Sequence, residues 1–176
     1  LGGAGNVAAN LVGLGAQVVC CGIHGADTSG QQLCDLLGEI GANTDAMLEC
    51  NDRPTIQKIR VMARNQQMLR VDREDSCALN ATSQQQLQEM LFAAEWDAIV
   101  LSDYGKGCLS AEFTQAIIAE AERRGVPSLV DPKHQDLSRY ANATMVTPNR
   151  NEAELSAGCA MTSLDDVKQQ GSKLRT

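Results

Sequence analysis

The chain has 176 residues, 43% of them apolar, and a formal net charge of −7. This is enough for one globular domain with a hydrophobic core. The sequence contains no block rich in Lys and Arg and only two Phe, two Tyr and one Trp, which argues against a nucleic-acid-binding protein. No apolar run approaches the length of a membrane span and no signal peptide is visible, so we expect neither nucleic acid nor membrane as a partner.

The first half of the chain begins with alternating helical and strand-like patterns, and its hydrophobic pattern changes after residue 43. Hydrophobic periodicity predicts a helix over residues 6–14, a strand over 17–23 and a second helix over 28–41. Three segments then alternate apolar and polar side chains, which is typical of two-sided strands in an antiparallel sheet. They are residues 44–49, 55–63 and 67–73. We therefore predict a small inserted β-sheet at about 44–73.

The second half repeats strands and helices in regular order. We predict a helix over 83–94, a strand over 98–101 and a helix over 111–124, followed by strands over 128–130 and 143–147, a helix over 151–157 and a helical end. Alternating strands and helices favour a mainly parallel sheet covered by helices on both faces. The predicted fold class is therefore α/β.

The seven cysteines predict a reducing compartment. Their number is odd, they contain no C-x-x-C pair, and most of them lie in apolar helical or strand-like segments. Reduced structural thiols explain this pattern better than disulfides or zinc ligands do. We expect a cytoplasmic protein.

Three successive predicted strands end in polar residues. The motifs are Ser102-Asp103-Tyr104-Gly105-Lys106-Gly107, Asp131-Pro132-Lys133 and Thr147-Pro148-Asn149-Arg150-Asn151-Glu152. Ligands of open α/β sheets bind outside the carboxyl ends of the strands. Lysines neutralise phosphate charge and carboxylates accept hydrogen bonds from hydroxyl groups, so this edge suits a polyhydroxy or phosphorylated ligand together with Mg²⁺. An aspartate taken alone at a strand end is more often a turn or cap residue, and the three successive strand ends together favour a site.

Asn149 and Glu152 have two explanations that the sequence leaves open. Three residues apart at a helix start, they face the same side and could hold hydrated Mg²⁺ or a phosphate through water. They also match a capping box, with asparagine at the N-cap and glutamate at N3. The two roles can coexist.

The opening glycines first suggest a dinucleotide site. Residues 3–8 satisfy G-x-G-x-x-G/A, and Asp27 lies at about the expected distance downstream. That interpretation requires a strand directly before the glycines, and none precedes them in this sequence. Asp27 also follows a Gly-containing turn, where we expect it to cap the helix that begins at residue 28.

Taken together, these motifs resemble the ribokinase-like (PfkB) carbohydrate kinases. The resemblance covers nearly all of residues 1–160. The motifs that carry it are residues 2–8, Gly15, Gly25-x-Asp27-x-x-Gly30, residues 54–60, 64–67 and 70–74, and the three strand-end motifs. Within the family, the sequence is most similar to the branch that phosphorylates D-glycero-β-D-manno-heptose 7-phosphate, the kinase half of a bifunctional kinase/adenylyltransferase of lipopolysaccharide synthesis.

The resemblance implies a three-layer α/β/α fold with a small β lid that often forms a homodimer contact. It implies transfer of the ATP γ-phosphoryl group to the anomeric hydroxyl of heptose 7-phosphate, giving the 1,7-bisphosphate, with ATP and Mg²⁺ as cofactors. The implied sugar ligands are Gly2, Gly3 and Asn6; the implied 7-phosphate ligands are Lys58, Arg60 and Arg70, with Asp72 as their structural partner. Asp103, Lys106, Asp131 and Lys133 would line the substrate site, Asn149 and Glu152 would serve ATP, and Glu152 would reach Mg²⁺ through water.

Two departures from the family pattern also stand out. The family's general base lies in a Gly-Ala-Gly-Asp loop, which does not occur in this sequence, and no strand precedes the opening glycines. We therefore expect residues 1–176 to be a partial kinase domain, incomplete at both ends and inactive by itself, with no catalytic base of its own. Another sugar or nucleoside kinase of the family, and a non-catalytic sugar-binding or dimerisation module, remain alternative functions.

Overall fold

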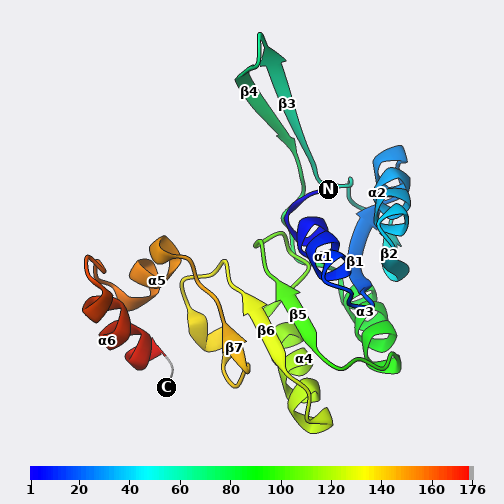
Figure 1. Ribbon diagram of the computed structural model, residues 1–176. Helices are drawn as coiled ribbons and strands as arrows, with labels where there is room; N and C mark the ends of the chain where they lie inside the picture. The colour runs from blue at the N-terminus through cyan, green and yellow to red at the C-terminus, as the bar shows by residue number, and fades with distance from the viewer. Residues whose placement is uncertain (175–176) are drawn as a thin grey trace. The chain divides into compact units, whose positions relative to one another are not determined.

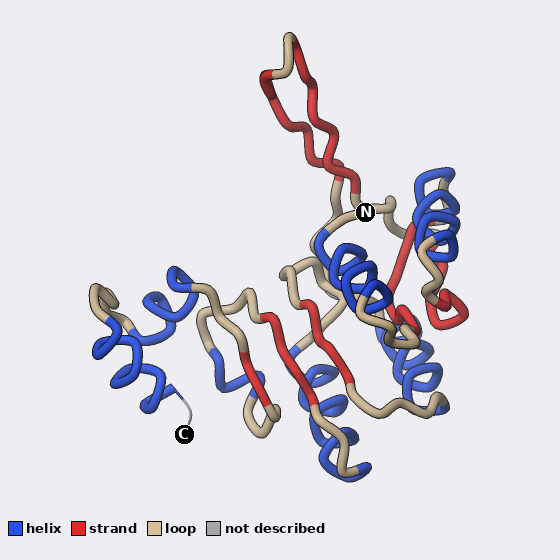
Figure 2. Tube along the Cα trace, viewed as in Figure 1, coloured by secondary structure: helices blue, strands red, loops and turns tan. Residues whose placement is uncertain are grey.

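The computed structural model describes residues 1–174, which form two compact units. The first unit consists of Leu1–Ala94 together with Lys106–Cys108, and the second begins at Glu95–Gly105 and resumes at Leu109. The predicted domain of residues 1–176 ends two residues beyond the described part. Figures 1 and 2 show the elements of each unit.

The first unit is built on a β-α-β crossover. Its elements are α1 (Gly3–Gly13), β1 (Val19–Gly25), α2 (Thr28–Glu39), β2 (Asn43–Cys50) and α3 (Ala81–Ala93). Strand β1 pairs in parallel with β2, in a register that runs from Val19↔Asn43 to Gly25↔Cys50. A core of Ala8, Leu37 and Ala42 joins α1 to α2. The helices and strands predicted for this region are confirmed.

The pairing predicted for residues 44–49 was wrong. We assigned them to an inserted antiparallel sheet, whereas β2 is the parallel neighbour of β1. The alternating pattern misled because it reports that one face of a strand is solvated, and says nothing about the direction of the neighbouring strand. Along β2 the exposed Asn43 and Glu49 lie on one face, and the buried Ala46 and Cys50 lie on the other.

A separate antiparallel hairpin follows β2. It consists of β3 (Gln57–Ala63) and β4 (Gln66–Arg73) and pairs with neither parallel sheet (Figure 1). Its two turn residues, Arg64 and Asn65, both have positive φ, 47° and 64°, as two-residue type I′ turns require. Every residue of β4 is exposed, so the hairpin is held by strand pairing and not by a core.

The second unit holds a three-stranded parallel sheet. The order is β5–β6–β7, formed by Ile99–Ser102, Ser128–Asp131 and Met145–Val146. The helices are α4 (Ala111–Arg124), α5 (Arg150–Ala157) and α6 (Leu164–Leu174), with a 3₁₀ turn at Leu137–Tyr140 that we did not predict. Phe113, Ile117 and Ile118 of α4 are almost fully buried, as is Val130 of β6.

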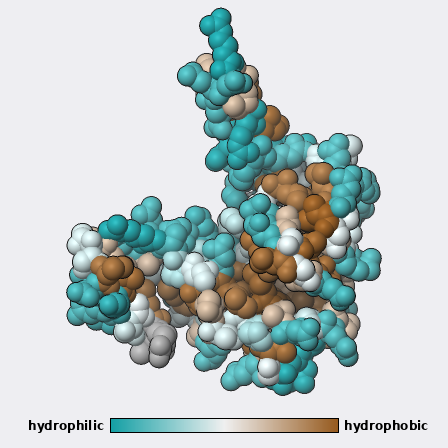
Figure 3. Space-filling model, viewed as in Figure 1, coloured by the Kyte–Doolittle hydropathy of each residue, from teal (hydrophilic) through white to brown (hydrophobic). Residues whose placement is uncertain are grey.

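The α/β class is therefore confirmed, with strands that are mainly parallel and alternate with helices in both units. Brown apolar side chains gather around α1 and β1 in Figure 3. None of the helices described is long and apolar enough to cross a bilayer. All seven cysteines, each of which lies within the described residues, are free thiols.

Candidate functional site

The three strand ends of the second unit lie in register, as the motifs predicted. Ser102 of β5 is paired with Asp131 of β6, and Val130 is paired with Val146 of β7. The polar residues that follow these strands consequently meet at one edge of the sheet. Lys133 Nζ lies 3.5 Å from Glu152 Oε1. Burial raises the pKa of Asp131, and the nearby Glu152 carboxylate raises it further.

Asp103 is buried and firmly bonded at this edge. Its Oδ2 accepts a hydrogen bond of 2.7 Å from the Tyr140 hydroxyl, and its Oδ1 accepts one of 2.8 Å from the Gly105 amide. Burial and this bond to Asp103 raise the pKa of Tyr140 to about 12. His134 Nε2 lies 3.6 Å from Asp103 Oδ2. The contact to Tyr140 could not be found from the sequence, because 37 residues separate the pair and no motif joins them.

Asn149 and Glu152 form the capping box that was one of their two predicted roles. The Asn149 side chain accepts from the Glu152 amide at 3.0 Å, and Glu152 Oε2 accepts from the Asn149 amide at 2.9 Å. This leaves Glu152 Oε1 facing Lys133. No three His, Cys, Asp or Glu side chains between residues 1 and 174 are grouped so as to hold a metal ion directly. The capping box uses Glu152 Oε2, so Oε1, which faces Lys133, is the carboxylate oxygen that a ligand could contact.

The opening glycines form the start of α1. Gly2 is its N-cap and supplies no side-chain hydrogen bond, while the Asn6 amide donates to the Gly2 carbonyl at 2.8 Å. Gly2, Gly3 and Asn6 are all exposed, and a Cβ at Gly2 would meet nothing within 4 Å. The first amides of the helix are thus accessible to hydroxyl or anionic oxygens, which helix N-termini favour.

One face of the hairpin carries the predicted phosphate ligands. The antiparallel register pairs Lys58 with Asp72 and Arg60 with Arg70, so these four side chains share a face. We call Lys58, Arg60 and Arg70 the basic face. Asp72 accepts from Lys58 Nζ at 2.9 Å and from Arg70 Nε at 2.8 Å, which confirms its predicted role as a structural partner. The hydrogen bond from Lys58 lowers the pKa of Asp72.

Arg60 and Arg70 place two positive charges directly opposite each other. Like charges in directly opposed positions destabilise a pair of strands. Arg70 is bonded to Asp72, whereas Arg60 has no ion-pair partner among the described residues. An anion bound between them would relieve this repulsion.

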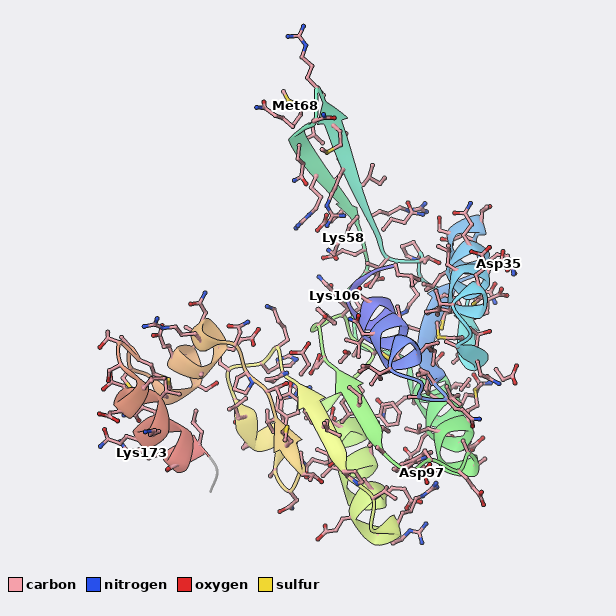
Figure 4. The ribbon with its side chains drawn as sticks, viewed as in Figure 1. Asp35, Lys58, Met68, Asp97, Lys106 and Lys173 are labelled. Carbon is pink, nitrogen blue, oxygen red and sulfur yellow. The ribbon has the colours of Figure 1, made fainter. Side chains whose placement is uncertain are left out.

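Lys106 lies near the hairpin and belongs to the first unit. Its Nζ lies 2.6 Å from Glu74 Oε1, and Lys58 Nζ lies 3.5 Å from Glu74 Oε2. Figure 4 shows Lys58 at the base of β3 and Lys106 in the loop after β5. The structure thereby joins Lys106 to Lys58. Sequence analysis did not identify Glu74, because 32 residues separate it from Lys106.

Asp27 caps α2, as predicted. Its Oδ1 accepts from the Gly30 amide at 2.9 Å, and the carboxylate also accepts from the Thr55 hydroxyl at 2.6 Å and the Thr55 amide at 3.0 Å. These hydrogen bonds, led by that of the Thr55 hydroxyl, lower the pKa of Asp27 to about 2. The carboxylate is committed to holding residue 55 against the helix start, which argues against a ribose ligand.

We call Asp27 and its hydrogen bonds to Thr55 and Gly30 the clasp. The clasp predicts a contribution to the stability of the fold that is lost in acid. Because the pKa of Asp27 is lower in the folded chain than its usual 3.8, the contribution is complete above pH 4 and is lost as the pH falls toward 2. We expect Asp27→Asn to lower the melting temperature at pH 7 and to flatten its decline between pH 4 and 2. Thermal unfolding across pH tests this. Asp45→Asn, which changes an exposed carboxylate, should keep the wild-type slope, and an equal slope in Asp27→Asn would contradict the assignment.

A hollow of about 410 Å³ lies beside this clasp. It is lined by Ala26, Asp27, Asn51, Asp52, Arg53, Pro54 and Arg73. None of the predicted ligand-binding residues lines it. Asp27 is already bonded to Thr55 and Gly30, and Asp52 Oδ2 accepts from Asn80 at 3.0 Å. The hollow therefore belongs to the base of the hairpin and not to the predicted site.

Comparison with protein families decides which of the sequence interpretations holds. The profile of the pfkB family carbohydrate kinases matches residues 1–176. The chain belongs to this family. It is 42% identical to the protein named "Bifunctional protein HldE" of Citrifermentans bemidjiense, over 99% of this chain and 36% of that relative. The chain thus spans about a third of the length of this curated relative.

Solved structures show the same fold. The tetrameric inhibited form of phosphofructokinase-2 from Escherichia coli matches with a TM-score of 0.78 and 24% identity, over 98% of this chain and 57% of that one. Arabidopsis thaliana ribokinase, solved with ribose and ATP, matches with a TM-score of 0.72 and 16% identity, over 97% and 55% of the two chains. The ribokinase-like fold class is confirmed, and the dinucleotide interpretation has no support left.

Proposed function

We propose that this chain is the sugar-binding part of a kinase that transfers the γ-phosphoryl group of ATP to the anomeric hydroxyl of heptose 7-phosphate, giving the 1,7-bisphosphate. The observation that best supports a phosphorylated substrate is the basic face of the hairpin. There Arg60 lies opposite Arg70, and Lys58 lies on the same side. The motifs and the 42% identity to a protein named as bifunctional support the heptose branch of the family. Its free thiols suit the reducing cytoplasm.

The remaining predicted residues take roles that their positions allow. Gly2, Gly3 and Asn6 offer exposed amides and a side-chain amide to sugar hydroxyls. Asp131 and Lys133 offer an acceptor and a donor at the strand ends, and Asp103 anchors that edge through Tyr140. Phosphoryl transfer relies on positioning and charge neutralisation more than on covalent chemistry by the protein, and side chains of these kinds are suited to both tasks.

ATP and Mg²⁺ would be served by Asn149 and Glu152. Burial raises the pKa of Asp131 and the neighbouring Glu152 carboxylate raises it further, so a cation held near both carboxylates would stabilise their charged forms. Mg²⁺ keeps several of its waters in proteins, so contact with Glu152 through water fits the single oxygen that the capping box leaves. Bound Mg²⁺ would neutralise charge on the phosphates of ATP.

The second face of the hairpin suits a homodimer contact, and a lid of this kind is the role we propose for residues 57–73. The register places Ile59, Val61, Leu69 and Val71 together on the face opposite to the basic face, and each is 44–49% exposed. Burying these side chains against the same face of a second copy would remove apolar surface from water. The expected partner is therefore a second chain of this protein.

Charge removal on the basic face tests the proposed substrate. We expect Lys58→Met and Arg70→Met each to weaken the binding of heptose 7-phosphate at least tenfold, a loss of about 1.4 kcal/mol, because each removes a cation from the phosphate site. The affinity for heptose without phosphate should not change. Isothermal titration calorimetry on the 176-residue chain measures both ligands.

Arg64→Met is the matched control, because it removes a cation from the hairpin turn and leaves the basic face intact. Equal losses in all three variants would show a general charge effect and contradict the assignment. Tight binding of fructose 6-phosphate or ribose, with none of heptose 7-phosphate, would favour another kinase of the family. Binding of sugar without ATP would favour a non-catalytic module.

Transfer itself can be tested in a chimera. Residues 1–176 would replace the matching segment of the Citrifermentans bemidjiense relative, and ATP-dependent phosphorylation of heptose 7-phosphate would be followed. We expect the chimera to turn over and its Lys58→Met variant to show a higher KM for the sugar phosphate. An inactive chimera that folds and binds the sugar would contradict the proposed kinase role.

A further inference from the structure

The cations of the hairpin and of the loop after β5 form one chain of ion pairs. Asp72 joins Arg70 to Lys58, and Glu74 joins Lys58 to Lys106. Each carboxylate thus bridges two cations. All five side chains belong to the first unit, and each is between a quarter and a half exposed, so a ligand from solvent can reach them.

The backbone holds Lys106 beside Glu74. The Gly107 carbonyl accepts from the Leu79 amide at 3.2 Å, and the Cα of Gly107 packs directly against the Cys77 carbonyl. The segment 106–108 therefore runs along residues 77–79, shortly after Glu74. The backbone packing therefore keeps Lys106 close to Glu74, so their ion pair depends on the fold and not on side-chain flexibility alone.

Glu74 holds its two ammonium groups as a phosphate would. Its Oε1 lies 2.6 Å from Lys106 Nζ and its Oε2 lies 3.5 Å from Lys58 Nζ. Over the whole chain of ion pairs, the three cations Arg70, Lys58 and Lys106 and the two carboxylates Asp72 and Glu74 leave a formal charge of +1. A phosphate monoester carries close to two negative charges above pH 7 and has three acceptor oxygens, so it matches the two cations better than the carboxylate does.

We infer that Glu74 occupies the phosphate position while no sugar phosphate is bound, and that the ligand's phosphate displaces it and binds Lys58 and Lys106 together. This inference rests on the proposed function, and it adds Lys106 to the phosphate site and makes Glu74 a specificity-determining residue. A ligand must carry more negative charge than Glu74 to displace it. The site therefore selects dianionic phosphate esters over sugars that carry a single carboxylate.

The test is the affinity for inorganic phosphate at pH 7.5, measured by isothermal titration calorimetry on the 176-residue chain. We expect Glu74→Gln to bind phosphate about three- to tenfold more tightly than the wild type, because the competing negative charge is gone. Acetate should bind measurably to Glu74→Gln and not to the wild type. Glu89→Gln, an exposed change of equal charge on α3, should leave both affinities unchanged.

Lys106→Met is the second variant, and it needs no change at Glu74. It should weaken phosphate binding about tenfold in the wild type and should abolish the gain of Glu74→Gln when the two are combined. Unchanged or weaker binding by Glu74→Gln would overturn the inference, as would an intact affinity in Lys106→Met. If Lys58→Met and Arg70→Met also fail to affect phosphate binding, the proposed function fails too, so the two failures can be distinguished.

Discussion

Replacing Gly107 with alanine is expected to destabilise the chain by about 3 kcal/mol or more. Gly107 has φ +78°, where side chains with a Cβ are strained, and its Cβ would overlap the carbonyl group of Cys77. The obstacle is backbone and cannot rotate away, so segment 106–108 must move from residues 77–79. Urea unfolding at pH 7 measures the loss. Lys106 would move with the segment, so phosphate binding should weaken as well.

Gly125→Ala separates the steric overlap from the strain of positive φ. Gly125 ends α4 with φ +71°, and a Cβ there would meet nothing within 4 Å. We expect this control to cost about 1 kcal/mol, the usual penalty for a left-handed residue with a side chain. It should leave phosphate binding unchanged. If Gly107→Ala costs no more than Gly125→Ala, the close packing against Cys77 does not hold Lys106 in place.

The second large effect is expected at Gly30. A Cβ here would overlap the Gly25 carbonyl and the His24 ring and would come within 3.0 Å of the Thr55 hydroxyl. Gly30→Ala should therefore push the start of α2 away from the end of β1 and weaken the bonds of Asp27 to Thr55. We expect a loss of about 3 kcal/mol in urea unfolding, because backbone atoms must shift to accommodate the methyl group.

Gly38→Ala is the control within the same helix. A Cβ at Gly38 would meet nothing within 4 Å, so alanine should stabilise the chain by about 0.5–1 kcal/mol through its better helix propensity. Opposite signs for the two substitutions would show that packing, and not helix propensity, requires glycine at position 30. A stable Gly30→Ala variant would contradict the close approach of α2 to β1.

Much of the fold follows from local patterns. The helix over 111–124 was predicted with its observed bounds, and the structure shows Ser110 capping its start and Gly125 its end. Strand directions were harder to predict. The alternation in 44–49 was read as an antiparallel strand, although residues 28–39 form a helix long enough to make β1 and β2 parallel neighbours. The hydrophobic period of a strand does not determine whether it runs parallel or antiparallel to its neighbour.

The candidate site also has residues that the sequence predicted and residues that only the structure identified. Motifs identified Asp131, Lys133 and Glu152, and strand register brings their segments to one edge of the sheet. Motifs did not identify Tyr140 or Glu74, whose partners lie 37 and 32 residues away. Contacts at such separations depend on how the chain folds back on itself. No local spacing signals them.

The sequence by itself determined the family, the α/β class and most of the residues proposed to bind ligand, because glycines, prolines and charged residues at set spacings reflect backbone and chemical requirements that are local. Only the tertiary structure decided which charges meet. It placed Arg60 against Arg70 through hairpin register, and Lys106 beside Glu74 through the packing of Gly107 on Cys77. Electrostatic interactions depend on distance in space, and chain folding alone sets that distance.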